Sequence, residues 1–302
     1  MSKGSRVPST TVRLGDVETP RIGYGAIRLP GEGAWGEPKN PDGARAVLRR
    51  VVDIGIRFID TAWYYGPHVA NRLIAETLYP YPGDLIIATK LGVCRTPDGG
   101  WAPFARPEQL REGAEHDLRE LKRDILDVAH LRFLAHSDVP FLESLDAMIA
   151  LQKAGKVRRI GLSGVGIGQL RQALARTKIV AVQNMFNIAG GGGAFARRTH
   201  SMVDDPDGVL ALCEQQSIAF IPYFPLGSGS LGKRQPALDA AAKRHSATAA
   251  QIALAWLLAR SPVTLPIPGT TSLEHLDENW NAQTVHLSPN EIEAIAHEGQ
   301  RG

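Results

Sequence analysis

The sequence predicts an α/β protein folded as a single (β/α)₈ barrel, or TIM barrel, and two features of the chain favour this class. Short apolar segments alternate with amphipathic segments of helical period almost from end to end. Eight apolar segments of this kind occur, and eight right-handed strand–helix units close most simply into a barrel, which leaves no sheet edge exposed. A length of 302 residues suits one such barrel. We therefore expect one domain over residues 1–302, with residues 1–11 flexible.

The predicted strands follow one another at spacings that leave room for a helix between most of them. A β-hairpin around Leu14–Asp16 is expected to precede the barrel. The eight barrel strands are predicted at Arg21–Leu29, Phe58–Ala62, Leu85–Gly92, Val128–His136, Arg158–Val165, Ile179–Asn187, Ala219–Pro225 and Val263–Pro268.

Three helices have the clearest patterns. In Pro107–Leu121 the apolar residues recur every three to four positions, which places them on one helical face. Pro140–Gly155 has a similar pattern and ends at a glycine, a common C-terminal stop. Ala247–Ala259 is rich in Ala and Leu, and Ser246 is expected to cap its N-terminus. An extra helix is expected at the C-terminus, outside the barrel repeat.

A doubly wound open sheet is the competing architecture. It would carry a GxGxxG turn after the first strand, where the glycines let the backbone approach a dinucleotide. Gly23 and Gly25 begin this spacing, but Arg28 stands at the third glycine position. The barrel is therefore favoured.

Composition excludes several classes of function. The net charge of +3 comes from basic residues interspersed with acidic ones, so no nucleic-acid partner is predicted. No apolar run approaches the roughly 20 residues that span a bilayer, so no membrane partner is expected. The two cysteines, Cys94 and Cys213, form neither a disulfide framework nor a zinc motif, and the histidines show no HxxxH spacing. We expect a soluble, cytoplasmic protein without a metal.

Polar residues follow three consecutive predicted strands at the rim where barrels carry their chemistry. Asp60 and Tyr65 follow the second strand, Lys90 ends the third, and His136 ends the fourth. Singly, each has a structural explanation, such as a solvated lysine or a satisfied core histidine. Together, on one rim, they are difficult to attribute to stability, because a buried charge is costly unless it is paired.

These four residues suggest proton transfer to a carbonyl oxygen. A free tyrosine titrates near pH 10, and a neighbouring cation lowers that pKa. Lys90, held by Asp60, would supply the cation and make Tyr65 a better proton donor near neutrality. His136 would hydrogen-bond and orient the substrate oxygen, so that developing charge meets donors already in position.

The segments that carry these residues resemble a known family. FIDTAWYYG, IATKLG and the strand ending in His136 are similar to the aldo-keto reductases, and GKVRRIGLSGV, VQNMFN, IPYFPLGSG and PIPGTTSLEHLDENW resemble later segments of the same family in order. The resemblance covers essentially the whole chain. It implies reversible hydride transfer between NAD(P)H and a carbonyl, with Asp60, Tyr65, Lys90 and His136 as the catalytic tetrad.

The resemblance also implies a cofactor site. Residues that would contact the nicotinamide cofactor are Gly25, Ala26, Asp60, Ser163, Gln183, Tyr223, Leu226, Ser228, Lys233, Gly269, Thr271, His275, Glu278 and Asn279. Gly164 follows Ser163 where many members have Asn, and Gly269 and His275 stand where members with a tight 2′-phosphate grip often carry Lys and Arg. NADPH is the expected cofactor, and NADH stays open.

The substrate pocket is expected to be aromatic, with Trp35, Trp63, Tyr64, Tyr65 and His136 as its residues. The segment TAWYYGPHVANRLIAETLYPYP resembles a bacterial branch that includes pyridoxal reductase-like enzymes, which makes an aromatic aldehyde such as pyridoxal a plausible small-molecule substrate. The glycine-rich stretch Ala189–Ser201 reads either as a surface linker or as a lid over the cofactor. A monomer or weak homo-oligomer is expected.

Two other functions remain open at this level. Relatives with this fold serve as cofactor-binding auxiliary subunits of potassium channels, which predicts bound cofactor with little turnover. Aldolases share the barrel and use a Schiff-base lysine, which here would be Lys90. That chemistry needs a lysine of depressed pKa, whereas Asp60 beside it favours the charged amine.

Overall fold

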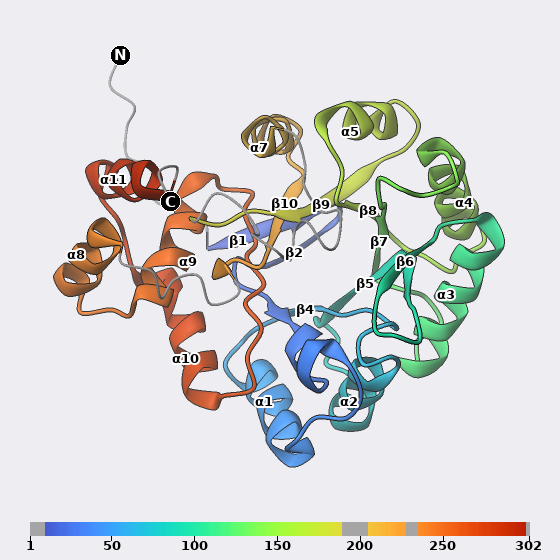
Figure 1. Ribbon diagram of the computed structural model, residues 1–302, viewed down its shortest axis with the longest axis horizontal. Helices are drawn as coiled ribbons and strands as arrows, with labels where there is room; N and C mark the ends of the chain where they lie inside the picture. Colours follow the sequence, from blue (N-terminus) through green and yellow to red (C-terminus); the bar gives the residue numbers. More distant parts are fainter. Residues whose placement is uncertain (1–9, 189–204, 228–234, 300–302) are drawn as a thin grey trace.

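A computed structural model describes residues 10–188, 205–227 and 235–299, which form a barrel of parallel strands surrounded by helices (Figure 1). Seven parallel strands lie side by side in the order β10-β9-β8-β7-β5-β4-β3. The strands are β3 (Tyr24–Gly25), β4 (Phe58–Asp60), β5 (Ile86–Arg95), β7 (Val128–Arg132), β8 (Ile160–Ser163), β9 (Ile179–Met185) and β10 (Ala219–Tyr223). The predicted fold class is confirmed.

The eighth predicted strand, Val263–Pro268, closes the barrel without forming a regular strand. The Phe220 amide donates to the Val263 carbonyl at 2.8 Å on one side. On the other side, the Gly23 amide donates to the Pro266 carbonyl at 3.0 Å. Pro266 and Pro268 have no N–H, so the ladder is interrupted here. The segment therefore joins β10 to β3 mainly through its carbonyl oxygens, which accept hydrogen bonds from the backbone amides on either side.

The first predicted strand, Arg21–Leu29, is also shorter than expected. Only β3 is extended, and the chain then turns into a 3₁₀ helix at Ala26–Arg28. A short antiparallel partner that was not predicted, β6 (Trp101–Phe104), pairs with the end of β5 and lengthens one wall of the barrel mouth.

An antiparallel hairpin precedes the barrel, as predicted. It consists of β1 (Thr11–Leu14) and β2 (Val17–Pro20), and Leu14 packs with Phe58 and Val180 in the core cluster inside the barrel. Thr11, the last residue of the segment expected to be flexible, pairs with Pro20 in this hairpin. Residues 1–9 of that predicted terminus lie outside the described residues, as does the predicted loop Ala189–Ser201.

Helices surround the barrel and cover the outer faces of its strands (Figure 1). They are α1 (Pro41–Asp53), α2 (Val69–Leu78), α3 (Pro107–Glu120), α4 (Phe141–Lys153), α5 (Ile167–Leu174), α7 (Pro206–Gln215), α8 (Pro236–His245), α9 (Ala249–Arg260), α10 (Leu273–Asn281) and α11 (Pro289–Gly299). The last of these is the predicted extra helix. Among the described helices, none is both long and apolar enough to cross a membrane.

The predicted cap of α9 is two residues too early. Ser246 ends α8 instead, with a left-handed φ of 50°. Thr248 is the residue that caps α9, because its hydroxyl accepts from the Gln251 amide while the Gln251 side chain accepts from the Thr248 amide. This reciprocal pair is a capping box, and it fixes the N-terminus of α9.

Candidate active site

Side chains of successive strands point into the barrel at every second position and reach its mouth in one polar layer. Phe58 lies in the interior core cluster, so Asp60, two residues later, points inward above it. The same alternation applies to two other strands. Lys90, two residues after Ala88, and Arg132, four residues after Val128, also point inward. The strand ends bring together the inward-facing residues Asp60, Lys90, Arg132, Ser163, Gln183 and Tyr223 along one cavity.

Asp60 and Lys90 form a buried ion pair at the closed end of this cavity. The Lys90 Nζ donates to Asp60 Oδ2 at 2.6 Å and to the Thr61 carbonyl at 2.9 Å. The other Asp60 oxygen accepts from Gln183 Nε2 at 2.7 Å. Both carboxylate oxygens are therefore hydrogen-bonded, and Lys90 Nζ is engaged by Asp60 and by the Thr61 carbonyl, which disfavours its use as the nucleophile of a Schiff-base mechanism.

Tyr65 lies beside this pair, with its ring centroid 4.8 Å from Lys90 Nζ. The expected lowering of its pKa is wrong for the protein alone. Burial, and then the charge of Asp60, raise the pKa of the Tyr65 phenol well above its ordinary value, and Arg132 lowers it by less. The physical reason is that burial disfavours the charged phenolate, and the negative charge of the nearby Asp60 disfavours it further.

His136 does not join this group. Strand β7 ends at Arg132 instead of His136, and His136 is exposed and lies outside the cavity lining. Arg132 occupies the cavity in its place, donating from Nη1 to Ser163 Oγ at 3.3 Å and to the Tyr223 hydroxyl at 3.4 Å. The period of two from Val128 through His130 was the signal that identifies Arg132 as inward-facing.

An inward-facing histidine, His130, lies below Arg132. Its Nδ1 is 3.2 Å from the Thr89 carbonyl, and burial lowers its pKa to about 4, so the ring is neutral. A Cβ on Gly161 would lie 2.5 Å from the His130 ring, which explains a glycine on the neighbouring strand. His130 fills the barrel under the polar layer.

A buried polar network supports the Asp60–Lys90 pair from the outer side of the barrel. Asp117 of α3 accepts from the Thr89 hydroxyl at 2.6 Å and from Asn71 Nδ2 at 2.7 Å. The Thr61 hydroxyl in turn donates to Asn71 Oδ1 at 2.8 Å. Thr61 follows Asp60 and Thr89 precedes Lys90, so one carboxylate ties together the two strand ends that carry the ion pair.

The cavity has a volume of about 700 Å³ and extends from this polar layer towards α9 and α10. It contains most of the residues predicted to bind the cofactor, namely Gly25, Asp60, Ser163, Gln183, Tyr223, Leu226, Gly269, His275, Glu278 and Asn279. Ala26 is buried and Thr271 exposed, and neither lines the cavity, whereas Thr270 does. Ser228 and Lys233 lie outside the described residues.

Sequence reasoning missed several residues of the cavity wall. Besides Arg132, Arg28 reaches the wall next to Gly269, and Thr248–Ala250 contribute the N-terminus of α9. Arg28 was noted only as an interruption of a glycine motif. Its position next to the last residue of the predicted strand Arg21–Leu29 was a signal for a rim residue.

Of the aromatic residues predicted for the substrate pocket, Tyr64 and Tyr65 line the cavity, and Trp35 and Trp63 do not. Trp35 is exposed, and Trp63 packs outward against His116 of α3. The tryptophan in the wall is Trp101, which makes an edge contact with Tyr64 at 5.6 Å between ring centroids. Trp101 lies on β6, a strand that the sequence pattern did not reveal.

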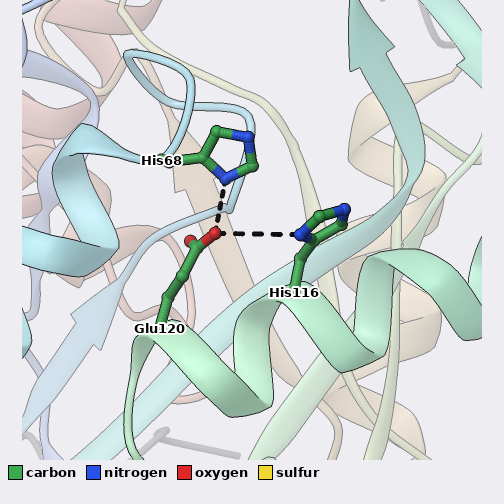
Figure 2. A group of neighbouring side chains, drawn as sticks. All are labelled: His68, His116 and Glu120. Atoms are coloured by element: carbon green, nitrogen blue, oxygen red, sulfur yellow. Dashed lines mark hydrogen bonds and ion pairs between the residues drawn. The ribbon is translucent and has the colours of Figure 1, made fainter.

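One group of potential metal ligands lies outside the cavity. The ligand atoms of His68, His116 and Glu120 fall within 4.8 Å of one another, and the Glu120 carboxylate points towards both imidazoles (Figure 2). Such a set could hold a divalent cation. His116 and Glu120 lie four positions apart on α3, whereas His68 precedes α2, so no single sequence spacing predicted the site. In this structure Glu120 pairs with His68, and Arg119 donates to His116 Nδ1 at 2.6 Å.

The chain matches a known protein family over most of its length. The model described as the aldo/keto reductase family matches residues 21–297. The chain belongs to the aldo/keto reductase family. This reductase is 41% identical over 285 residues to pyridoxine 4-dehydrogenase of Escherichia coli (strain K12), which covers 93% of this chain and 95% of that protein.

Two further relatives support the assignment. The reductase is 40% identical over 290 residues to an uncharacterized oxidoreductase of Schizosaccharomyces pombe, covering 96% of this chain and 90% of the relative. The crystal structure of an aldo/keto reductase from Klebsiella pneumoniae in complex with NADP and acetate matches with a TM-score of 0.77 and 27% identity, covering 96% and 95% of the two chains. The reductase is therefore an oxidoreductase of the carbonyl-reducing type.

Proposed function

We propose that this reductase transfers hydride reversibly between NADPH and an aldehyde, with Tyr65 as the proton donor and an aromatic aldehyde such as pyridoxal as the substrate. The observation that carries the proposal is the contact of Tyr65 with the buried Asp60–Lys90 pair at the inner end of the cavity. The pyridoxine 4-dehydrogenase of Escherichia coli supports the choice of aldehyde.

The cavity wall fits a phosphorylated dinucleotide. Its inner end carries Ser163 and Gln183, whose side chains suit a carboxamide, and its outer end carries His275 near the N-terminus of α10. Thr248–Ala250 bring the N-terminus of α9 to the same wall, where backbone N–H groups favour anions. Arg28 adds a cation at the rim. The Klebsiella pneumoniae structure with NADP supports NADPH as the cofactor.

Each polar residue then has a defined task. When bound, NADPH supplies the hydride for the carbonyl carbon. Tyr65 donates its hydroxyl proton to the carbonyl oxygen, and the phenol, which titrates near pH 10 even when free, is protonated at neutral pH, as a proton donor must be. Arg132 donates hydrogen bonds to the same oxygen and meets the charge that develops there. Lys90 and Asp60 hold the Tyr65 ring in position.

The decisive test is the replacement Tyr65→Phe, which removes only the hydroxyl. We expect reduction of pyridoxal, followed by absorbance at 340 nm with NADPH and with NADH, to fall by at least about 100-fold. Cofactor binding, measured by fluorescence titration, should persist. Tyr79→Phe is the matched control, because Tyr79 is exposed and lies outside the cavity lining. A Tyr65→Phe enzyme with most of its activity would show that another group donates the proton.

A further inference from the structure

Arg132 gives the cavity a permanent positive charge beside the reacting group. It ends β7, points into the barrel mouth, and has its guanidinium carbon 5.3 Å from the centroid of the Tyr223 ring. Its Nη1 donates to Ser163 Oγ and to the Tyr223 hydroxyl at 3.3 and 3.4 Å. These two contacts are long and go to neutral hydroxyls, so an anionic oxygen could replace them with shorter and stronger hydrogen bonds.

The surrounding wall strengthens such an interaction. Tyr64, Trp101, Val93 and Leu134 line the same end of the cavity and present mostly apolar surface. A charge-assisted hydrogen bond is worth more in these surroundings than in water. Arg132 thus offers recognition of negative charge within a pocket that otherwise suits a flat ring.

The shape of the guanidinium narrows the choice of ligand. It is planar and presents parallel N–H groups that bind two neighbouring oxygens together. In an aromatic aldehyde with a hydroxyl on the adjacent ring carbon, the aldehyde oxygen and the hydroxyl oxygen lie side by side in the plane of the ring. These two oxygens match the guanidinium in the way that a carboxylate does.

We propose that Arg132 makes the reductase selective for aromatic aldehydes that carry an acidic hydroxyl next to the aldehyde, by binding the carbonyl oxygen and the ionised hydroxyl oxygen at once. The inference rests on the proposed function and names the substrate class of that same site. Tyr65 would still supply the proton, and Arg132 would set which aldehydes are presented to it.

The test compares kcat/KM for three simple aldehydes: 2-hydroxybenzaldehyde, 2-methoxybenzaldehyde and benzaldehyde. The wild-type reductase should prefer the 2-hydroxy compound over both others by roughly 10- to 100-fold, the range for a hydrogen bond to a charged group. This preference should grow as the pH rises through the ionisation of the substrate hydroxyl, while the rate with benzaldehyde should not follow that ionisation.

Two variants assign the preference to Arg132. In Arg132→Gln all three kcat/KM values should fall, because Arg132 also meets the charge on the carbonyl oxygen, and the fall should be largest for the 2-hydroxy compound, so that the three values become nearly equal. Arg132→Lys should keep part of the preference because it retains the charge without the planar fork. NADPH titration of each variant checks that the cofactor site is intact. Equal rates for the three aldehydes in the wild type, or an undiminished preference in Arg132→Gln, would overturn the inference alone. Failure of the wild-type reductase to reduce any of the aldehydes would overturn the proposed function and the inference with it.

Discussion

Lys90 and Asp60 satisfy each other in a place where neither charge could remain alone. Their side chains are 5% and 3% exposed, and the N–O distance is 2.6 Å. Burial of this extent makes each partner depend on the other, because an unpaired charge inside a protein is far more costly than the pair. The ion pair is therefore a structural element of the barrel mouth, and its ammonium lies against the Tyr65 ring.

The replacement Lys90→Met should accordingly destabilise the protein by about 3–5 kcal/mol, since it leaves the Asp60 carboxylate buried without its cation. Urea denaturation followed by circular dichroism measures the change in the free energy of unfolding. Asp277→Asn serves as the control, because Asp277 pairs with Arg50 on the surface, where both side chains are substantially exposed. Equal stability of the two variants would contradict the importance of the buried pair.

Asp117 connects the helix α3 to the strand ends that carry the ion pair. It is fully buried on α3 and holds the ends of β4 and β5 through Asn71 and Thr89. Burial raises the pKa of Asp117 to about 7 despite hydrogen bonds from Thr89 and Asn71, which lower it. An acid whose pKa is raised by folding stabilises the folded state only while it is protonated, so its contribution is lost as the pH rises from about 4 to about 7.

We therefore expect the stability of the Asp117→Asn variant to increase relative to that of the wild type as the pH rises. The difference in unfolding free energy between the two proteins, measured in urea at pH 5 and pH 8, should shift towards the variant at pH 8. The exposed Asp124→Asn is the control. An identical difference at both pH values would show that Asp117 does not change its protonation over this range.

Helix α9 depends on its cap in a similar way. Thr248→Ala removes the hydroxyl that accepts from the Gln251 amide, and should lower stability by about 1 kcal/mol. Ser246→Gly, two residues earlier, should leave stability unchanged or higher, because residue 246 has a φ of 50° that glycine adopts without strain. Thermal denaturation of the two variants compares the effects of the two positions on stability. A larger loss of stability in the Ser246 variant would contradict the observed cap.

At the scale of the whole molecule, the barrel closes where its first and last segments meet. A Cβ on Gly25 would lie 2.6 Å from the Ile267 carbonyl, and one on Gly269 would lie 2.5 Å from the Gly25 carbonyl. The two backbones approach this closely because neither residue has a side chain. The closure also forms part of the cavity wall, since both glycines line it.

Gly25→Ala should therefore force the closing segments apart and cost about 1–3 kcal/mol, as overpacking usually does. Chemical denaturation gives the change in stability, and NADPH titration should show weaker binding. Gly168→Ala is the control, because nothing lies within 4 Å of its added Cβ. A Gly25→Ala protein as stable as the wild type would show that the closure has more space than the structure indicates.

Local patterns predicted the parts of this protein in which side chains alternate regularly. Most of the apolar strands, α3 and α4, the hairpin, and the placement of Asp60, Tyr65 and Lys90 around one barrel mouth followed from period and composition, because burial imposes a period on the residues it selects. His136 was chosen over Arg132 because the end of β7 was placed four residues too late. The error arose because the alternation of side chains shows that a strand is present but does not show at which residue it ends.

Other features depend on residues far apart in the sequence. The contact of Arg132 with Tyr223, the wall formed by Trp101, the network around Asp117 and the closure at Gly25 and Gly269 each join segments that the sequence keeps separate. Even the pKa of Tyr65 moved opposite to expectation, because it responds to burial and to the charges around it together. The sequence by itself determined the barrel and the residue types at its mouth. The tertiary structure decided which of them share one desolvated cavity, because burial and electrostatic coupling depend on distances in space.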